Sequence, residues 1–240
     1  MAKLILDTST WLDIAKPRVE EVLAELEEQV QQGITILLTC DIIIDEWDRN
    51  KTRVLKEVVA SIRAHAKSAL KMSELLPEAE KATLISIVEK YTKIESEQER
   101  LAEVFFDRIE KLLKGSEVFS ISDSIKVDMA NRALTKQAPF HNNKNNMADA
   151  LLYFGAVDHV NQNNQIATDL LFVTSNFKEF NDPTVFNKLH PDLYKGNVHF
   201  SNNLAQALKM RKEAIDLMDE YTEYKFWDWI ETDAEIARGK

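Results

Sequence analysis

Short apolar runs separated by much longer stretches with helical periodicity are the feature of this 240-residue chain that most limits its fold. The runs are residues 3–6, 34–39, 118–121, 170–173 and 197–200. Each run suits a buried strand, and the segments between the runs suit helices. Strands that alternate with helices favour a parallel sheet covered by helices on both faces. We therefore expect an α/β chain with a three-layer α/β/α fold.

The longest helical segments lie between the second and third runs. One segment begins with Asp41 as its N-cap and continues to about Lys71, and the other covers about residues 78–114. Pro77 interrupts the helical pattern between them. We expect them to form a long helical hairpin, residues 51–115, that projects from the sheet.

The remaining helices carry start and stop signals of their own. Pro17 opens a helix over residues 18–32, and Gly33 ends it. Further helices are expected after Ser122 or Asp123, over residues 147–160, and after Ser201, which is expected to cap a closing helix followed by an acidic tail.

The net charge of −10 is unevenly spread along the chain. From Lys51 to Met72 there are six basic residues and one acid, whereas residues 213–236 hold nine acids and one Lys. A local basic face attracts a polyanion whatever the overall charge. The alternative interpretation of the same residues is a solvated helix face.

The cellular setting is bounded by what the sequence lacks. A single cysteine, Cys40, excludes an internal disulfide and fits a reducing compartment. No apolar run approaches the ~20 residues needed to cross a bilayer. The start of the sequence lacks the apolar region of a signal peptide. We expect a cytoplasmic protein without membrane association.

Acidic residues occur where strands are expected to end or helices to begin. Asp7 follows the first run, Glu46 follows the second, Asp149 opens the helix at 147, and Glu179 comes shortly after the fourth run. Open parallel sheets build their sites at the carboxyl ends of their strands. If the four side chains meet there, their like charges raise one another's pKa values unless cations are bound.

Each acid also has a structural interpretation. Asp7 could cap a helix or form a turn, and Glu46 could simply favour the positive end of its helix, where Asp45 or Asp48 could replace it as the functional acid. Asp149 is harder to explain as a solvated side chain, because small and apolar residues flank it.

The fourth position is open between Glu179 and Asp182, and its neighbourhood could be plain turn chemistry.

Clustered carboxylates suit Mg²⁺ or Mn²⁺, which prefer oxygen ligands. Two such ions about 3.5–4 Å apart can activate water and stabilise the leaving oxygen in phosphodiester cleavage. Other chemistries lack their motifs: the chain has no Gly-rich nucleotide loop, no Gly-x-Ser-x-Gly elbow and no zinc-ligand spacing among its histidines. Hydrolysis of a phosphodiester by metal-activated water is the expected reaction.

Four motifs taken together resemble those of PIN-domain ribonucleases. They are Leu4-Ile5-Leu6-Asp7-Thr8-Ser9, Glu46 after the second run, Ala148-Asp149-Ala150-Leu151, and Val173-Thr174-Ser175-Asn176-Phe177-Lys178-Glu179-Phe180. The resemblance implies that Asp7, Glu46 and Asp149 bind the metal. Glu179 stands where one subgroup of the family has Asp, which leaves open whether the site holds one metal or two.

The resemblance also implies a domain plan and a function. Residues 1–202 would form a PIN-like nuclease domain with residues 51–115 as an insertion, as in the larger bacterial PIN-like proteins, and residues 203–240 an acidic helical extension. The activity implied is metal-dependent endonucleolytic cleavage of RNA. An inhibitory partner protein is expected only by analogy with toxin–antitoxin members, and a homo-oligomer through the tail is open. The role is open between toxin, defence effector and RNA-processing enzyme.

The residues expected to contact substrate surround the acids or lie on the basic face. They are Thr8, Ser9, Thr174 and Asn176 in the pocket, Lys51 and Arg53 on the basic face, and Lys144 in the loop before Asp149. Two rival functions remain: a flap-type DNA nuclease, and a non-catalytic interaction module whose hairpin and tail are the working surfaces.

Overall fold

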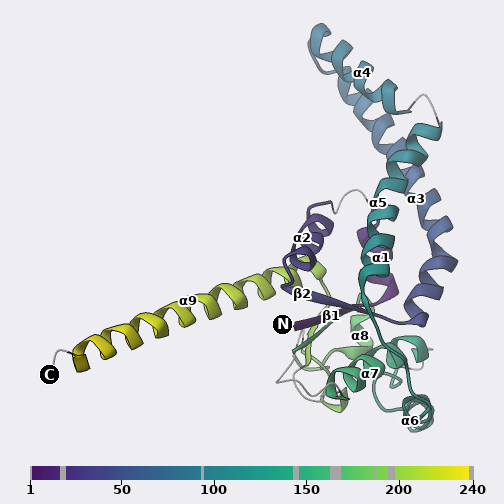
Figure 1. Cartoon of the computed structure of the whole chain (residues 1–240). Helices are drawn as coiled ribbons and strands as arrows, with labels where there is room; N and C mark the ends of the chain where they lie inside the picture. The colour runs from purple at the N-terminus through teal and green to yellow at the C-terminus, as the bar shows by residue number, and fades with distance from the viewer. Residues whose placement is uncertain are drawn as a thin grey trace. The chain divides into compact units, whose positions relative to one another are not determined.

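The computed structural model describes residues 2–16, 20–92, 95–142, 146–162, 169–185, 188–193 and 198–237. These residues belong to two compact units, 1–202 and 203–240. The first unit contains a central sheet with helices packed around it (Figure 1). The second consists of the helix α9 (Leu204–Ala237).

Five parallel strands form the sheet, in the order β3-β2-β1-β4-β5. They are β1 (Ala2–Leu6), β2 (Thr35–Thr39), β3 (Glu117–Val118), β4 (Leu170–Val173) and β5 (Val198–Ser201). The expected parallel sheet is therefore confirmed. The third strand is shorter than predicted, because the ladder between β2 and β3 pairs only Glu117 and Val118 before the chain leaves the edge.

The three central strands supply the core. Leu4, Ile5, Leu6, Leu38 and Phe172 are each at most 1% exposed. Strands covered on both faces need apolar side chains at successive positions rather than an alternating pattern. Each fully buried side chain of this kind contributes about 1.5–3 kcal/mol, so these short runs are sufficient to anchor the sheet.

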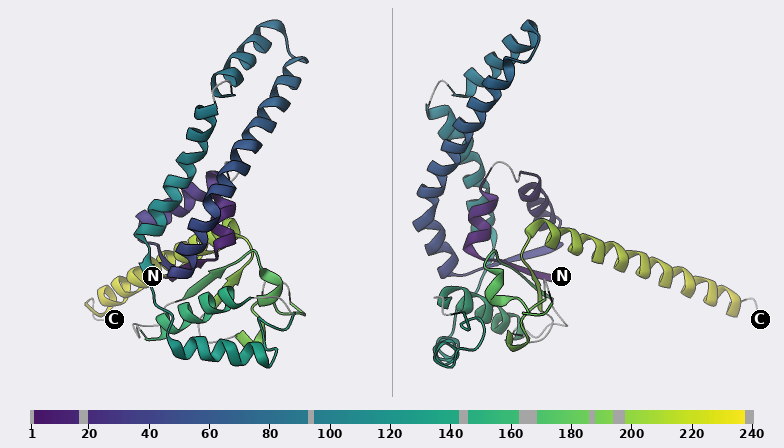
Figure 2. Two further views of the ribbon diagram at one scale, coloured as in Figure 1. Left: turned by 90° about the vertical axis from the view of Figure 1, so that its right-hand side faces the viewer. Right: turned by 180° about the vertical axis from the view of Figure 1, so that it is seen from behind.

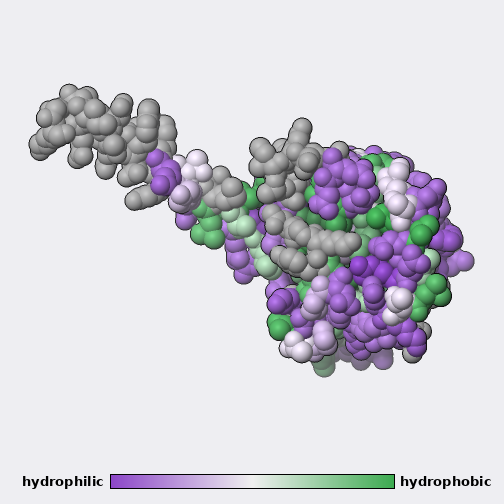
Figure 3. Space-filling model, turned by 90° about the horizontal axis from the view of Figure 1, so that it is seen from below, coloured by the Kyte–Doolittle hydropathy of each residue, from purple (hydrophilic) through white to green (hydrophobic). Residues whose placement is uncertain are grey.

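Helices cover both faces of the sheet, which confirms the three-layer prediction (Figures 1 and 2). On one side lie α1 (Thr8–Ile14), α2 (Glu20–Gln31), α3 (Asp41–Ser73) and α5 (Glu95–Gly115). On the other side lie α6 (Asp123–Leu134) and α7 (Met147–Gln162), and the short helix α8 (Phe177–Phe180) follows β4. Seen from below, the first unit is mainly hydrophilic, with apolar side chains scattered over it (Figure 3).

A long helical hairpin projects from the layer that contains α1, α2, α3 and α5, here called the upper layer; the layer of α6 and α7 is the lower layer (Figure 2). Its outgoing arm is α3, and its returning arm is made of α4 (Glu78–Thr92) and α5. Trp47 of α3 packs against Phe106 of α5 with their ring centres 5.4 Å apart, and both side chains are buried. The base of the hairpin is therefore part of the core.

Arg108 ties α5 to α2. Its guanidinium donates to Glu20 at 2.7 Å and to Glu27 at 2.6 Å. These hydrogen bonds, that to Glu27 above all, raise the pKa of Arg108 above its usual value. A guanidinium that donates two hydrogen bonds to a carboxylate has a more fixed orientation than a lysine contact. The contacts of Arg108 with Glu20 and Glu27 therefore hold the root of the hairpin against α2.

Several helix starts differ from the sequence prediction. Helix α1 was not expected, and Asp7 caps it. Cys40 rather than Asp41 is the N-cap of α3. Of the two predicted caps of the helix after β3, Ser122 is confirmed as the N-cap of α6. The predicted cap of the closing helix, Ser201, is wrong: Ser201 ends β5, and the Asn203 side chain accepts from the Gln206 N–H at 3.0 Å instead. Capping residues are short and polar, so neighbouring candidates compete for one position.

The end of α2 follows the predicted Gly33 stop. Gly33 has a φ of 70°, a left-handed conformation that costs glycine little. The Ile34 N–H then donates to the Gln29 carbonyl at 3.0 Å, which closes the helix end and directs the chain into β2. Pro17, the predicted start of this helix, lies outside the described residues. Among the described residues, no helix combines the length and apolar character that crossing a bilayer requires.

Gly155 of α7 provides a test of the packing between the lower layer and the chain after β3. A Cβ at Gly155 would lie 2.9 Å from side-chain atoms of both Phe119 and Ile121. Gly155→Ala is expected to destabilise the protein by about 1–2 kcal/mol in urea denaturation, because crowding a packed core outweighs the gain in helix propensity. Gly115→Ala is the control, since nothing lies within 4 Å of a Cβ there. Equal stabilities of the two variants would contradict this packing.

Candidate active site at the carboxyl ends of β1 and β4

The strand order creates a switch point between β1 and β4. The chain leaves β1 toward β2 on one side and returns later to β4 on the other. Open α/β sheets bind ligands at such a point, beyond the carboxyl ends of the strands. Asp7 and Thr174 are the first residues after β1 and β4, and the Asp7 N–H donates to the Val173 carbonyl at 3.0 Å.

Asp7 is buried and held by three hydrogen bonds. One oxygen accepts from the Thr10 N–H at 2.7 Å and so caps α1. The other accepts from the hydroxyls of Ser9 at 2.7 Å and Thr174 at 2.5 Å. The carboxylate is 1% exposed and has a fixed orientation. Its helix-capping role leaves room for a functional role, because the cap takes only one of these three hydrogen bonds and is the single one of the three on its oxygen.

Asp149 lies in the first turn of α7 and is half-buried. Its carboxylate accepts from the Asn176 side-chain amide at 3.1 Å. Burial, followed by the charge of Asp7 and more weakly those of Glu46 and Glu179, raises the pKa of Asp149 from 3.8 to about 6. The hydrogen bond from Asn176 acts in the opposite direction. The structure therefore brings all four predicted acids into one electrostatic neighbourhood.

The other two predicted acids, Glu46 and Glu179, come from two further elements. Glu46 is a half-buried residue near the start of α3, and Glu179 of α8 is 2% exposed. Asp182 has a different role, because one of its oxygens accepts from the Thr184 N–H, the Thr184 hydroxyl and the Val185 N–H. These hydrogen bonds lower the pKa of Asp182 and mark it as a turn former. Glu179, rather than Asp182, is among the main causes of the raised pKa of Asp149.

The alternatives to Glu46 lie elsewhere on the same helix. Asp45 and Asp48 are both exposed, and Asp48 forms an ion pair with Lys51 at 2.8 Å. The charge of Glu46, rather than that of Asp45 or Asp48, is among the main causes of the raised pKa of Asp149.

The residues predicted to shape the pocket are gathered around Asp7 and Asp149. Thr174 is buried, donates to Asp7, and accepts from the Asn176 N–H at 3.0 Å. The Ser9 hydroxyl contacts that of Ser175, which the prediction left out although it stands between Thr174 and Asn176. Thr8 is buried in the first turn of α1.

Two of the basic residues predicted to contact substrate pair with acids of the hairpin instead. Lys51 pairs with Asp48 and, at 3.2 Å, with Glu110 of α5, and these partners raise its pKa. Arg53 pairs with Glu57 one turn further along α3, at 2.6 Å. Lys144 lies outside the described residues.

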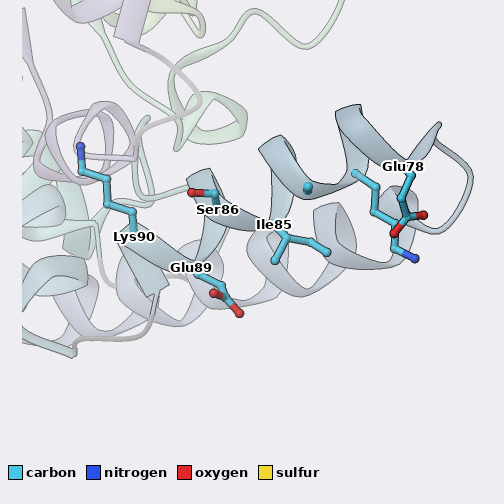
Figure 4. A pocket seen from close by; sticks show the side chains of 7 residues that line it. Glu78, Ile85, Ser86, Glu89 and Lys90 are labelled. Carbon is cyan, nitrogen blue, oxygen red and sulfur yellow. The ribbon is translucent and has the colours of Figure 1, made fainter.

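A shallow hollow on the hairpin is unrelated to this site. It is lined by Glu78, Lys81, Ala82, Ile85, Ser86, Glu89 and Lys90 (Figure 4). All of these side chains come from α4, so the hollow is one face of a single helix. It includes none of the four acids.

The acids have the chemistry of a hard-cation site without the arrangement of a finished one. Among the described residues, no three His, Cys, Asp or Glu side chains are grouped closely enough to hold a metal. Their donors are nevertheless carboxylate, hydroxyl and amide oxygens, which suit Mg²⁺ and Mn²⁺. A divalent cation would also counter the repulsion that, after burial, raises the pKa of Asp149. The residues present therefore fit such an ion by their chemistry.

Comparison with known families assigns the chain. A family model described as a PIN domain matches residues 4–180. The chain belongs to the PIN-domain family. No curated protein and no solved structure gives a significant match.

Membership confirms the resemblance inferred from the four motifs. The matched range of the PIN domain begins in β1, passes through the hairpin and ends with α8, so it includes Asp7, Glu46, Asp149 and Glu179. PIN domains are typically nucleases that act on nucleic acids, and they generally bind divalent metal ions.

The raised pKa of Asp149 predicts a pH-dependent stability effect. The folded PIN domain binds this proton more tightly than the unfolded chain, so its stability falls as pH rises from about 4 to about 6. Asp149→Asn removes the charge while keeping an acceptor for Asn176. Without divalent ions, the variant is expected to be more stable than the parent by about 1–2 kcal/mol at pH 7, below the ~3 kcal/mol of a fully buried group.

Urea denaturation of both proteins at pH 4 and pH 7, in EDTA, measures this effect. The difference between them should be much smaller at pH 4, where the carboxyl of the folded parent is protonated and that of the unfolded chain is about half protonated. A difference that is the same at both pH values would mean that neither burial nor the neighbouring acids raise the pKa of Asp149.

Proposed function

We propose that this PIN domain is a metal-dependent endoribonuclease. The observation that supports this proposal most is the chain of hydrogen bonds that runs from Asp7 through Thr174 and Asn176 to Asp149 at the sheet's switch point. Burial first, and then the charges of Asp7, Glu46 and Glu179, raise the pKa of Asp149 there. Carboxylates assembled at a cost in stability are a feature of functional sites. A divalent cation is the partner that such an assembly requires.

Asp7, Glu46 and Asp149 would hold Mg²⁺ or Mn²⁺, and Glu179 would assist. The ion supplies charge stabilisation on the phosphodiester and lowers the pKa of water. The chain's own residues position the ligands: Thr174 and Ser9 fix Asp7 by hydrogen bonds, and Asn176 fixes Asp149.

The finer parts of the proposal rest on resemblance and charge. RNA as substrate follows from the resemblance to PIN ribonucleases, and the basic residues of α3 suit any polyanion. A cytoplasmic location fits the single, free and buried Cys40. A role as a toxin or defence effector would call for an inhibitory partner protein, which is an argument from family analogy alone.

Removing the charge of Asp149 should abolish cleavage. Asp149→Asn is expected to lower the rate of RNA cleavage in Mn²⁺ by at least about 100-fold, because loss of a metal ligand costs roughly 3 kcal/mol or more of transition-state stabilisation. EDTA should have the same effect on the parent protein. Matched RNA and DNA oligonucleotides, followed on gels, distinguish a ribonuclease from a DNA nuclease. Equal cleavage by parent and variant would show that Asp149 is not part of the site.

Asp7 allows its two roles to be separated. Asn is as good an N-cap as Asp, so Asp7→Asn should lose activity while α1 remains capped. Asp7→Ala should lose activity and also about 1 kcal/mol more stability. Activity assays and thermal melts of the two variants measure both effects. Retention of activity in Asp7→Asn, despite its lost charge, would limit Asp7 to a structural role.

The fourth acid is tested by a matched pair. Glu179→Gln is expected to lower the cleavage rate, since Glu179 acts on Asp149. Asp182→Asn should leave the rate unchanged, since Asp182 is engaged with Thr184 and Val185. The opposite result would transfer the fourth position to Asp182.

A further inference from the structure

The outer face of α3 carries a line of exposed basic side chains. They are Arg49, Arg53, Lys56, Arg63, Lys67 and Lys71, here called the basic stripe. At 100° per residue their directions fall within an arc of about 80° around the helix. The roughly opposite face holds Val54 and Val58, which are buried. The stripe therefore faces solvent along most of the hairpin's outgoing arm, and Arg63 also reaches α5, where its Nε–H donates to Gln98 at 2.5 Å.

The stripe is uniform in sign, which an ordinary solvated helix face is not. Between Arg49 and Lys71 the only acid in the sequence is Glu57, which lies at the edge of the arc and pairs with Arg53. Lys51 is not part of the stripe, because it points toward α5 and pairs with Glu110.

The stripe begins beside the candidate active site. Arg49 lies three residues after Glu46, on the same side of the helix. From Arg49 to Lys71 the helix rises about 33 Å, at 1.5 Å per residue. The stripe therefore extends from the acids outward along the projecting hairpin (Figure 2).

We propose that the basic stripe is a track for the sugar–phosphate backbone of a single-stranded nucleic acid whose scissile end lies at the acids. This inference rests on the proposed function, since it extends the same site. The track holds phosphates rather than bases, because the only Phe, Tyr or Trp residue of α3, Trp47, is 2% exposed and presents no stacking surface. Binding should therefore depend weakly on base sequence.

A single strand fits the stripe better than a duplex does. Each strand of a duplex winds around the axis and returns to a straight row only once in about 34 Å, which is the length of the whole stripe. A duplex would therefore meet the stripe at one or two points. A flexible single strand can follow it from end to end and engage all six charges.

Salt dependence measures how many of these charges bind phosphate. Six contacts to a single strand predict a slope of about −4 in a plot of log K against log salt concentration, at roughly −0.7 per contact. Removing three of the six lysines and arginines should bring the slope to about −2. The lysines are the better choice, since the three arginines have hydrogen bonds within the chain.

The test compares two triple variants with the same change in charge. The stripe variant is Lys56→Gln, Lys67→Gln and Lys71→Gln, and the control is Lys90→Gln, Lys111→Gln and Lys114→Gln, which lie on the other two helices of the hairpin. Both are made in the Asp149→Asn background, so that binding is measured without cleavage. Circular dichroism confirms that each variant is folded.

Fluorescence anisotropy is measured with a single-stranded RNA of about 20 nucleotides, longer than the stripe requires, with the matching DNA strand and with a duplex. The stripe variant should lose affinity and about half the slope, and the control should retain the parent's slope. Similar slopes on RNA and DNA support a track that reads phosphate, and a slope confined to one of them identifies the sugar that it prefers. Equal slopes in both triple variants, or a duplex bound as tightly as the single strand, would overturn the proposal.

Cleavage separates this proposal from the proposed function. With Asp149 intact, the stripe variant should lower kcat/KM about tenfold or more on the long RNA. It should leave kcat/KM unchanged on a dinucleotide, because the single phosphodiester of a dinucleotide lies at the acids and does not reach the lysines of the stripe. If the parent cleaves nothing, the nuclease proposal fails while the anisotropy result still decides the stripe. If the parent cleaves both lengths and the stripe variant does so equally well, the track fails and the nuclease stands.

Discussion

The hydrogen bond between Thr174 and Asp7 is the contact on which the rest of the site depends. It joins the ends of the neighbouring strands β1 and β4, through two residues that are 167 apart in sequence. These strands lie at the switch point of the sheet, where the direction in which strands are added reverses. Asp7 also caps α1. Thr174 also accepts from the backbone N–H of Asn176, and the side-chain amide of Asn176 donates to Asp149. One continuous set of hydrogen bonds thus links β1, α1, β4 and α7. The ends of the buried strands β1 and β4 therefore position the two central acids.

In this PIN domain, the clustering of acids that suits the binding of a cation lowers the stability of the fold. Asp149 is ionised at neutral pH only against burial and three neighbouring charges, so the folded chain is least stable where the site is most charged. The apolar strands beneath, with Leu4, Ile5 and Leu6 almost fully buried, supply enough free energy to tolerate that strain. A cation at the acids would remove part of it, and binding would then stabilise the fold as well as enable chemistry.

The sequence predicted what depends on pattern and missed what depends on tertiary contact. The apolar run at residues 170–173 defined β4 to the residue, and the acids at strand ends indicated the site, because both follow from periodicity and from parallel-sheet geometry. Helix α1 was missed because Thr8-Ser9-Thr10 has poor helix propensity, and the cap at Asp7 and the burial of Trp11 and Ile14 stabilise it instead. The roles of Asp182 and Asn203 depended on hydrogen bonds that no spacing reveals.

The hairpin gains its significance from being continuous with the site. Helix α3 carries Glu46 in its second turn and the basic stripe along the turns that follow, so one rigid element holds an acid and the cations that lead to it. The burial of Trp47 against Phe106, and the contacts of Arg108 with α2, fix the root of that element on the sheet domain. A nucleic acid bound along the stripe would therefore meet the acids at a set distance and angle. Net charge alone, at −10, hides this, because recognition of a polyanion depends on where cations lie in space and not on their sum.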